Sequence, residues 1–243
     1  MGTFVLVHGA WGGAHTWRGV RPLLWQAGHA VFTPSLTGIG ERSHLTGPHV
    51  DLSVHVDDVV NTVLYEDLHD IVLVGFSYGG MVVTGALEHI ADRVRKLLYL
   101  DAFVPADGQS VADLTAAMGR GEPVPTTRGP GEPWLVPPRE RSFDDPAEAA
   151  FSEPRRTPQP LRTFTEPVRL VRPLEDHPFG RTYVKALGDR AATTGRAAFR
   201  GSGRPLPRPP RLAVPRAPEQ PHDPAERPER VGRDPARAGV IEA

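Results

Sequence analysis

The stretch I-V-L-V-G-F-S-Y-G-G-M-V-V, residues 71–83, decides the fold of this chain. Its first four residues are a continuous apolar run of strand length, and the residues that follow Ser77 have the apolar spacing of a helix. Between these segments, residues 75–79 spell G-F-S-Y-G, which matches the G-x-S-x-G pattern of a strained turn between a strand and a helix. Flanking glycines let the strand and the helix approach closely and leave the serine hydroxyl exposed. Ser77 is therefore the candidate nucleophile, because a chance match would lack the adjacent strand and helix.

The composition indicates a globular protein without a strong electrostatic bias. The chain has 243 residues, of which 39% are hydrophobic, enough for a large domain with a buried core. A net charge of -1 favours neither nucleic acid nor an anionic membrane as a partner. The absence of cysteine excludes disulfides and cysteine-bound metal. No leader-like segment or apolar run of membrane-spanning length is found, so the cytoplasm is the expected compartment.

Strands and helices alternate through the first hundred residues. Strands are expected at residues 3–7, 30–33, 71–74 and 96–100. Helices are expected from about Trp17 to a stop at Gly28, over 56–64, and from the serine turn to about Ala91. This alternation predicts an α/β fold with a mostly parallel sheet, whose site lies at the carboxyl ends of the strands.

A glycine-rich turn, H-G-A-W-G-G at residues 8–13, follows the first strand. Such a turn directs backbone N–H groups towards a ligand, and this one lacks the spacing of nucleotide-binding loops. With Ser77 as nucleophile we interpret it as an oxyanion site; without that serine, an ordinary turn would be the better interpretation. The loop at 35–45 is expected to wall the same site.

The alternation stops at about residue 104, where the chain becomes rich in proline and charge. Short amphipathic pieces at 111–118, 146–151 and 161–170 favour a small helical cap over a long surface excursion. Five side chains are expected to supply its apolar pocket lining: Trp134, Leu135, Phe151, Phe164 and Leu170. A strand at 181–187 then returns to the sheet. The predicted division is a first part of the core at 1–103, the cap at 104–180, a second part of the core at 181–195 and a tail at 196–243.

A serine nucleophile needs a base within hydrogen-bond reach and an acid that orients the base. In a fold with this serine turn, the acid and then the histidine follow in sequence. His89 lies twelve residues further along the expected helix, on the order of 18 Å from Ser77. His177 precedes the strand at 181–187 and so belongs at the opposite edge of the sheet. His222 follows a weak strand and is the candidate base.

Two carboxylates are candidates for the acid. Asp189 follows the strand at 181–187, and Asp101 follows the strand at 96–100, so both lie at a carboxyl strand end. Asp189 is the preferred acid and Asp101 the alternative. A turn or capping residue that bonds its own loop is the other interpretation of Asp101.

Five motifs resemble those of one family. They are F-V-L-V-H-G-A-W-G-G, T-P-S-L-T-G-I-G-E-R-S-H-L, V-G-F-S-Y-G-G-M-V, Y-L-D-A-F-V-P and R-T-P-Q-P-L, and the match covers about residues 3–190. The chain resembles the α/β-hydrolase superfamily, specifically bacterial esterases similar to plant methyl salicylate esterases and hydroxynitrile lyases. The resemblance implies an α/β-hydrolase fold with a small helical cap, and a serine esterase that uses no cofactor or metal.

The resemblance also implies a role for each site residue. Ser77 would be the nucleophile, the N–H groups of Ala10 and Tyr78 the oxyanion donors, and Asp189 the acid. The histidine of the family stands in a pattern like S-H-[DNS]-P, which P-H-D-P around His222 approximates. The expected partner is a small-molecule ester.

Two alternatives to an esterase stay open. A hydroxynitrile lyase-like enzyme would use the same pocket, but lyases of this group carry a lysine beside the histidine, where this chain has Asp223. A non-catalytic ligand-binding protein on the same scaffold is the second alternative.

The tail at 196–243 departs from the family. It holds ten prolines and ten arginines and few large apolar residues, so the strand and helix that close such a sheet are expected to be degraded or disordered. A second hypothesis is a frameshift. Permissible codons for 210–222, read one base later, spell R-D-W-R-Y-R-E-L-P-S-S-H, and the same shift through 232–241 can spell A-G-I-L-L-E-P-A before a stop. The coding DNA around codons 190–243 tests this hypothesis.

The tail as written predicts weak or absent activity. His222 stands near the family position of the base, but the strand and helix that would hold it are not encoded around it. A displacement of about 1 Å can lower a catalytic rate roughly a hundredfold.

Overall fold

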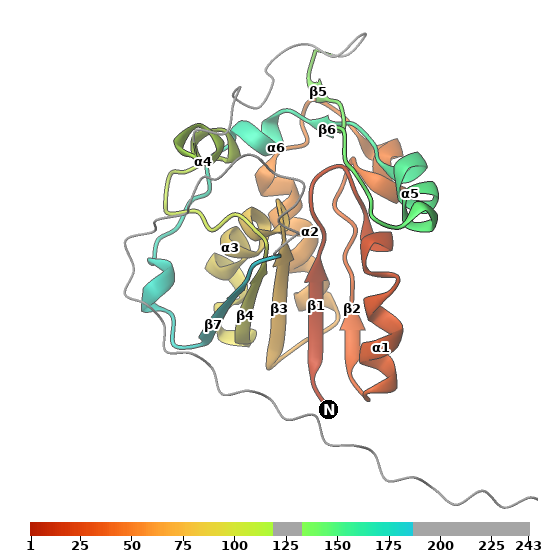
Figure 1. Ribbon diagram of the computed structural model, residues 1–243. Coiled ribbons are helices and arrows are strands. Elements are labelled where there is room, and N and C mark those ends of the chain that lie inside the picture. Colours follow the sequence, from red (N-terminus) through yellow and green to blue (C-terminus); the bar gives the residue numbers. More distant parts are fainter. Residues whose placement is uncertain (119–132, 187–243) are drawn as a thin grey trace, which may run out of the picture. The chain divides into compact units, whose positions relative to one another are not determined.

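The computed structural model describes residues 1–118 and 133–186 (Figure 1). A five-stranded sheet with the order β2-β1-β3-β4-β7 lies at the centre of this part, and each neighbouring pair is parallel. The strands are β1 (Thr3–Val7), β2 (Ala30–Phe32), β3 (Ile71–Phe76), β4 (Val94–Leu100) and β7 (Gly180–Val184). The predicted parallel α/β sheet is confirmed. The expected weak strand at 212–214 lies outside the described residues.

Two helices cover one face of the sheet. They are α2 (Leu52–Tyr65) and α3 (Gly79–Ile90), and α3 buries all but two of its side chains. The apolar spacing at 56–64 correctly predicts the buried face of α2, except that Leu64 is 41% exposed. Strand residues alternate between the two faces of a sheet, so Val5 and Leu73 pack under these helices while Leu6 and Val72 join a smaller cluster on the other face.

The first predicted helix is divided into two pieces. A 3₁₀ helix, η1 (Ala14–Trp17), precedes α1 (Val20–Gln26), and Gly28 ends the segment at a φ of 78°. Trp17 is buried, whereas α1 buries none of its side chains, and Leu23 is 65% exposed. The apolar spacing therefore correctly indicates helical turns, but it does not show that they form separate elements.

Short elements lie beyond the carboxyl ends of the strands in the segment that was predicted to form a cap (Figure 1). They are α4 (Val111–Ala117), α5 (Pro146–Ser152), η4 (Glu153–Arg155), α6 (Arg162–Thr165) and a two-stranded antiparallel sheet of β5 (Leu135–Val136) and β6 (Gln159–Pro160). A further 3₁₀ turn, η5 (Leu174–Asp176), then precedes β7. Helix α6 is shorter than the predicted piece at 161–170. Glu166 precedes Pro167, and a residue before proline disfavours the helical conformation. The boundaries of the core, cap and tail remain predictions.

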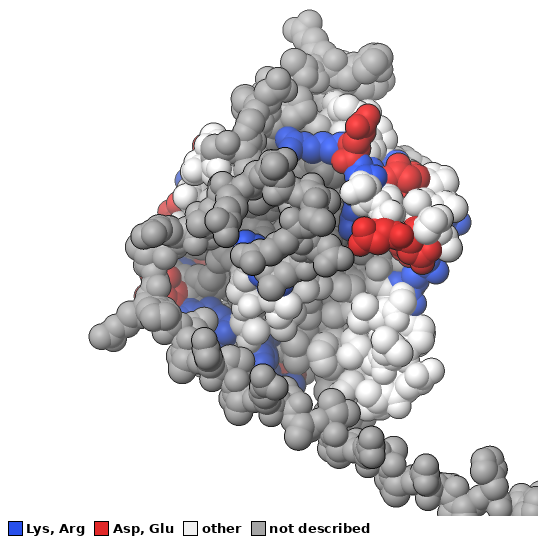
Figure 2. All heavy atoms as spheres, viewed as in Figure 1, with Lys and Arg blue, Asp and Glu red and all other residues white. Residues whose placement is uncertain are grey.

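The surface carries charges of both signs. Figure 2 shows acidic and basic side chains next to one another on one face. One ion pair, Arg18 with Glu148 (2.6 Å), joins α5 to the segment after η1, and a local pair, Arg156 with Glu153 (3.2 Å), lies at the end of η4. Within the described ranges, no helix is both long enough and apolar enough to cross a membrane.

Candidate active site

The predicted serine turn joins β3 to α3. Ser77 has a φ of 53°, in the left-handed region that a residue with a side chain occupies only with strain. Its N–H donates to the carbonyl oxygen of Leu100 (3.2 Å), and its own carbonyl oxygen accepts from the N–H groups of Gly80 and Phe103 (3.1 Å each). The end of β4 and the residues after it therefore fix the backbone of the strained turn.

Close backbone approach explains the glycines on both sides of Ser77. A β carbon on Gly75 would lie 2.8 Å from the carbonyl oxygen of Gly79. A β carbon on Gly79 would lie 2.7 Å from the carbonyl oxygens of both Val7 and His8. The start of α3 thus rests directly on the end of β1, which brings the serine turn and the glycine-rich turn together.

A cavity of about 300 Å³ opens beside Ser77. Its lining comes from both turns, from the residues after β4, from α4 and α6, from the segment between β5 and α5, and from β7 and the residues that follow α4 and β7: Ala10, Trp11, Ser77, Tyr78, Asp101, Ala102, Phe103, Val111, Thr115, Met118, Arg139, Phe164, Tyr183 and Lys185. The arrangement gives Ser77 a mostly apolar chamber with a few polar side chains, which is the usual form of a small-molecule site.

The expected pocket lining is largely wrong. Of the five predicted apolar side chains, only Phe164 lines the cavity. Phe151 instead lies between two guanidinium groups, 3.8 Å from that of Arg18 and 4.0 Å from that of Arg155. The loop at 35–45, expected to wall the site, does not line the cavity either.

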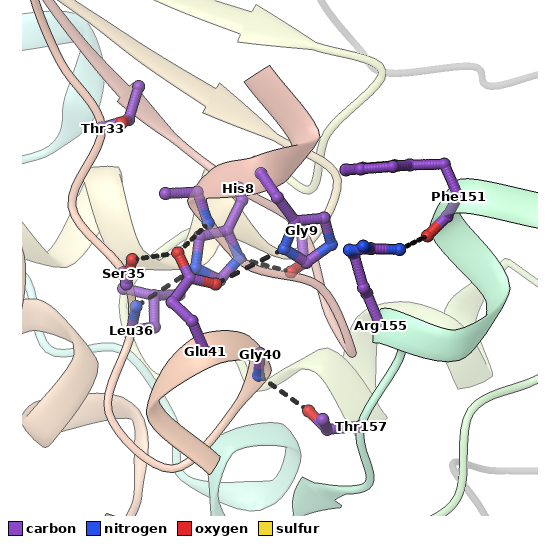
Figure 3. A network of polar contacts seen from close by, with 12 residues as sticks. His8, Gly9, Thr33, Ser35, Leu36, Gly40, Glu41, Phe151, Arg155 and Thr157 are labelled. Atoms are coloured by element: carbon purple, nitrogen blue, oxygen red, sulfur yellow. Dashed lines mark hydrogen bonds and ion pairs between the residues drawn. The ribbon is translucent and has the colours of Figure 1, made fainter. Parts of the chain in front are cut away.

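That loop holds the glycine-rich turn instead (Figure 3). The carboxylate of Glu41 accepts from the N–H of Ala14 (2.9 Å) and the hydroxyl of Ser35 (2.5 Å). The N–H of Gly40 donates to the hydroxyl oxygen of Thr157 (2.7 Å), which lies just before β6. The loop is therefore a support for the site and a link to the segment above it.

His8 fixes the other end of the glycine-rich turn (Figure 3). The N–H of Leu36 donates to Nε2 of His8 (3.1 Å), so the ring proton is on Nδ1, which donates to the carbonyl oxygen of Gly9 (2.9 Å). Complete burial lowers the pKa of His8 to about 4. The imidazole is therefore a neutral structural bridge.

Trp11 ties the glycine-rich turn to β5 and β6. Its backbone N–H donates to the side-chain oxygen of the fully buried Gln159 (2.8 Å), and its indole N–H donates to the carbonyl oxygen of Val136 (3.1 Å).

By contrast, the backbone N–H groups of Ala10 and Tyr78 have no acceptor among the described residues. Both line the cavity with Ser77. Their role as oxyanion donors remains a prediction that this arrangement supports.

Of the two predicted acids, Asp101 lines the cavity with Ser77. Its backbone has a φ of 43°, and its N–H donates to the carbonyl oxygen of Val184 (2.7 Å), which joins the ends of β4 and β7. The preferred acid Asp189 and the candidate base His222 lie outside the described residues.

The two histidines that were rejected as the candidate base, His89 and His177, do not line the cavity. His89 is exposed on α3, and His177 is buried before β7, where its ring stacks on Phe179 with centroids 5.1 Å apart. In the part of the chain that the structure describes, no cluster of acidic and histidine side chains could hold a metal ion.

His55 and the cavity residue Arg139 are not among the residues predicted from the sequence. His55 Nδ1 lies 3.0 Å from the hydroxyl of Tyr78, and its Nε2 lies 2.7 Å from the carbonyl oxygen of Thr37. Its position four residues before Val59 places it on the buried face of α2, so the helical period could have identified it. Arg139 lies in a proline-rich stretch without any period, so no sequence signal marks it.

The neutral histidines His8 and His55 predict a pH-dependent stability. Burial lowers the pKa of each from 6.5 to about 4, so only the unfolded chain binds these protons between those values. The contribution of each histidine to the free energy of unfolding is therefore complete above pH 6.5, and roughly 3 kcal/mol of it is lost as the pH approaches 4. Urea unfolding from pH 7 to 4.5 measures this loss. In His55→Asn, the slope of the free energy of unfolding against pH should correspond to about one bound proton fewer than in wild type. An unchanged slope in that variant would contradict the neutral, buried state of His55.

Comparison with known sequences agrees with this geometry. A family model described as the alpha/beta hydrolase family matches residues 4–233. A carbendazim hydrolyzing esterase from Nocardioides sp. (strain SG-4G) is 51% identical over 114 residues, 47% of this chain and 47% of that protein. An alpha-hydroxynitrile lyase from Arabidopsis thaliana is 34% identical over 108 residues, 42% of this chain and 40% of the lyase. The matches thus span less than half the length of these curated relatives.

A solved structure extends the likeness to the fold. It is an extracellular alpha/beta-hydrolase from a Paenibacillus species, described as sharing structural and functional homology with tobacco salicylic acid binding protein 2. The TM-score is 0.59 at 29% identity, over 76% of this chain and 77% of that chain. The resemblance inferred from the five motifs and the predicted fold class are thereby confirmed. With a matching family model over most of its length and the same fold, the chain belongs to the alpha/beta hydrolase family.

Proposed function

We propose that this chain is a serine hydrolase that cleaves a small carboxylic ester. The observation that carries the proposal is the position of Ser77, which lies on a strained turn and lines the same cavity as Ala10 and Tyr78, whose backbone N–H groups have no acceptor among the described residues. A nucleophile beside unpaired donors is the arrangement that acyl transfer requires. The esterase relative, 51% identical over the matched part, supports the same reaction class.

The proposed reaction proceeds through an acyl-enzyme. The Ser77 oxygen attacks the ester carbonyl while His222 takes its proton, and the N–H groups of Ala10 and Tyr78 bind the oxyanion. His222 then gives the proton to the leaving alcohol. In the second half, His222 takes a proton from water, the water oxygen attacks the acyl carbonyl, and the proton passes to the Ser77 oxygen as the acid leaves. Asp189 orients the imidazole in this proposal.

Asp101 is the alternative acid. It lines the cavity with Ser77, and its backbone is fixed between β4 and β7. The aromatic walls from Trp11, Phe103 and Phe164 suit an ester with a flat apolar part. A small-molecule ester of this kind is the proposed partner.

Covalent labelling of the full chain by a fluorophosphonate tests the proposal directly. Only an activated serine reacts, and the adduct accumulates even where turnover is slow. We expect one adduct by intact mass, mapped by peptide analysis to Ser77, together with slow hydrolysis of p-nitrophenyl acetate. An unlabelled chain without ester hydrolysis would overturn the proposal in favour of a non-catalytic binding protein.

A hydroxynitrile lyase-like reaction is the second candidate, because one relative with 34% identity is an alpha-hydroxynitrile lyase. It would use the same cavity and the same serine. Aldehyde release from mandelonitrile, measured beside ester hydrolysis, separates the two reactions. We expect the ester to be the better substrate, and cleavage of the cyanohydrin alone would favour the lyase.

A further inference from the structure

The side chain of Tyr78 is buried and held on three sides. It is 1% exposed, and its ring makes edge contacts with the rings of His55 and Phe164, each with centroids 5.7 Å apart. Its hydroxyl lies 3.0 Å from Nδ1 of His55. The residue directly after Ser77 is therefore tied to α2 by its side chain, and it also lines the cavity.

The direction of the hydrogen bond between Tyr78 and His55 follows from the other ring nitrogen. Nε2 of His55 lies 2.7 Å from the carbonyl oxygen of Thr37, which can only accept, so Nε2 carries the proton. Nδ1 is then an acceptor, and the Tyr78 hydroxyl donates to it. Burial lowers the pKa of His55 to about 4, so the ring keeps this neutral form.

The carbonyl of Thr37 is itself held in place. The N–H and the hydroxyl of Thr37 both donate to the carboxylate of Asp58, at 2.6 and 2.8 Å, and Arg42 pairs with the same carboxylate at 2.9 Å. A continuous series of hydrogen bonds thus runs from Asp58 through Thr37 and His55 to Tyr78. Each member fixes the orientation of the next.

We propose that His55 is a positioning residue that holds the backbone N–H of Tyr78 at the oxyanion site. The inference rests on the proposed function, in which that N–H binds the developing negative charge. Only two single bonds, Cα–Cβ and Cβ–Cγ, separate the anchored ring of Tyr78 from its backbone, so the fixed position of the ring restricts the position of the amide. An oxyanion donor must lie within hydrogen-bond distance of the charged oxygen, and small displacements lower the rate steeply.

A second buried tyrosine provides the matched control. The hydroxyl of Tyr99 lies 2.7 Å from the hydroxyl of Thr84 on α3, and Tyr99 is 3% exposed. Tyr99→Phe therefore removes the same atom from a similar environment, but Tyr99 neither lines the cavity nor adjoins the nucleophile. A purely structural role for the Tyr78 hydroxyl predicts the same behaviour for both Phe variants.

The rate of fluorophosphonate labelling separates the two roles, because the phosphoryl oxygen gains negative charge at the same place as an ester carbonyl. We expect Tyr78→Phe to label Ser77 about tenfold more slowly than wild type. Tyr99→Phe should keep the wild-type rate, with circular dichroism confirming that both variants fold. Where ester turnover is measurable, the loss in Tyr78→Phe should fall on kcat, with KM unchanged.

Two substitutions at His55 test the acceptor itself. Gln places an amide nitrogen near the position of Nε2 and keeps the bond to Thr37 but loses the acceptor for Tyr78, whereas Asn places an oxygen near Nδ1 and keeps that acceptor. We expect His55→Gln to label as slowly as Tyr78→Phe, and His55→Asn to recover most of that loss. Equal labelling rates in wild type, Tyr78→Phe and His55→Gln would overturn the positioning role. An unlabelled wild type would instead count against the proposed function.

Discussion

Ser77→Ala is expected to abolish fluorophosphonate labelling and to reduce ester hydrolysis at least about a thousandfold. The variant removes the oxygen atom that forms the acyl-enzyme in the proposed reaction. Ala retains a β carbon, so it occupies the same strained backbone, at a φ of 53°, without new contacts. The measurement is intact mass after labelling, together with initial rates of p-nitrophenyl acetate hydrolysis.

Ser152→Ala is the control for this result. Ser152 ends α5, donates to Glu148 at 2.6 Å and does not line the cavity, so its removal should leave labelling and hydrolysis at wild-type levels. Labelling that persists in Ser77→Ala would place the reactive group elsewhere in the chain. Hydrolysis that persists without labelling would point to a water-based reaction in the cavity.

Gly80→Ala is expected to lower the free energy of unfolding by about 3 kcal/mol or more. A β carbon there would lie 2.0 Å from the carbonyl oxygen of Phe103 and 2.9 Å from the β carbon of Ala102. Helix propensity alone favours Ala by about 1 kcal/mol, so the sign of the effect depends on this clash. The N–H of Phe103 donates to the carbonyl oxygen of Ser77, so the forced shift should also disturb the serine turn.

Urea unfolding measures this effect, with Gly19→Ala as the control. Gly19 has a φ of -82° and no atom within 4 Å of the position that a β carbon would take, so that variant should unfold at the wild-type midpoint. Wild-type stability in Gly80→Ala would contradict the close approach of the Phe103 carbonyl to α3.

The sheet and the serine turn could be predicted because periodicity reports burial directly. Val59 and Val63 are buried where the helical period places them, and the apolar run before Ser77 forms the central strand β3. Leu64 fits the same apolar period but lies at the rim of the buried face, and it is exposed. Periodicity identifies a face of a helix, while the width of the covered strip depends on the neighbours.

The lining of the cavity could not be predicted, because an apolar residue in an irregular segment carries no information about its partner. Phe151 fits an ester pocket by composition, yet it packs between Arg18 and Arg155, where its ring face attracts two cations. Of the predicted site residues, Ser77, the alternative acid Asp101 and the predicted oxyanion donors Ala10 and Tyr78 line one cavity. The catalytic roles of all the predicted site residues stay predictions.

The positive φ of Ser77 implies a conflict between stability and activity at the centre of the protein. Glycine would occupy that backbone without strain, whereas a residue with a side chain in this conformation is strained by on the order of 1 kcal/mol. A library of variants selected for folding alone should therefore drift towards Gly at position 77. Selection that also demands catalysis should retain Ser, so the residue preference at this single position reports whether the chain is maintained as an enzyme.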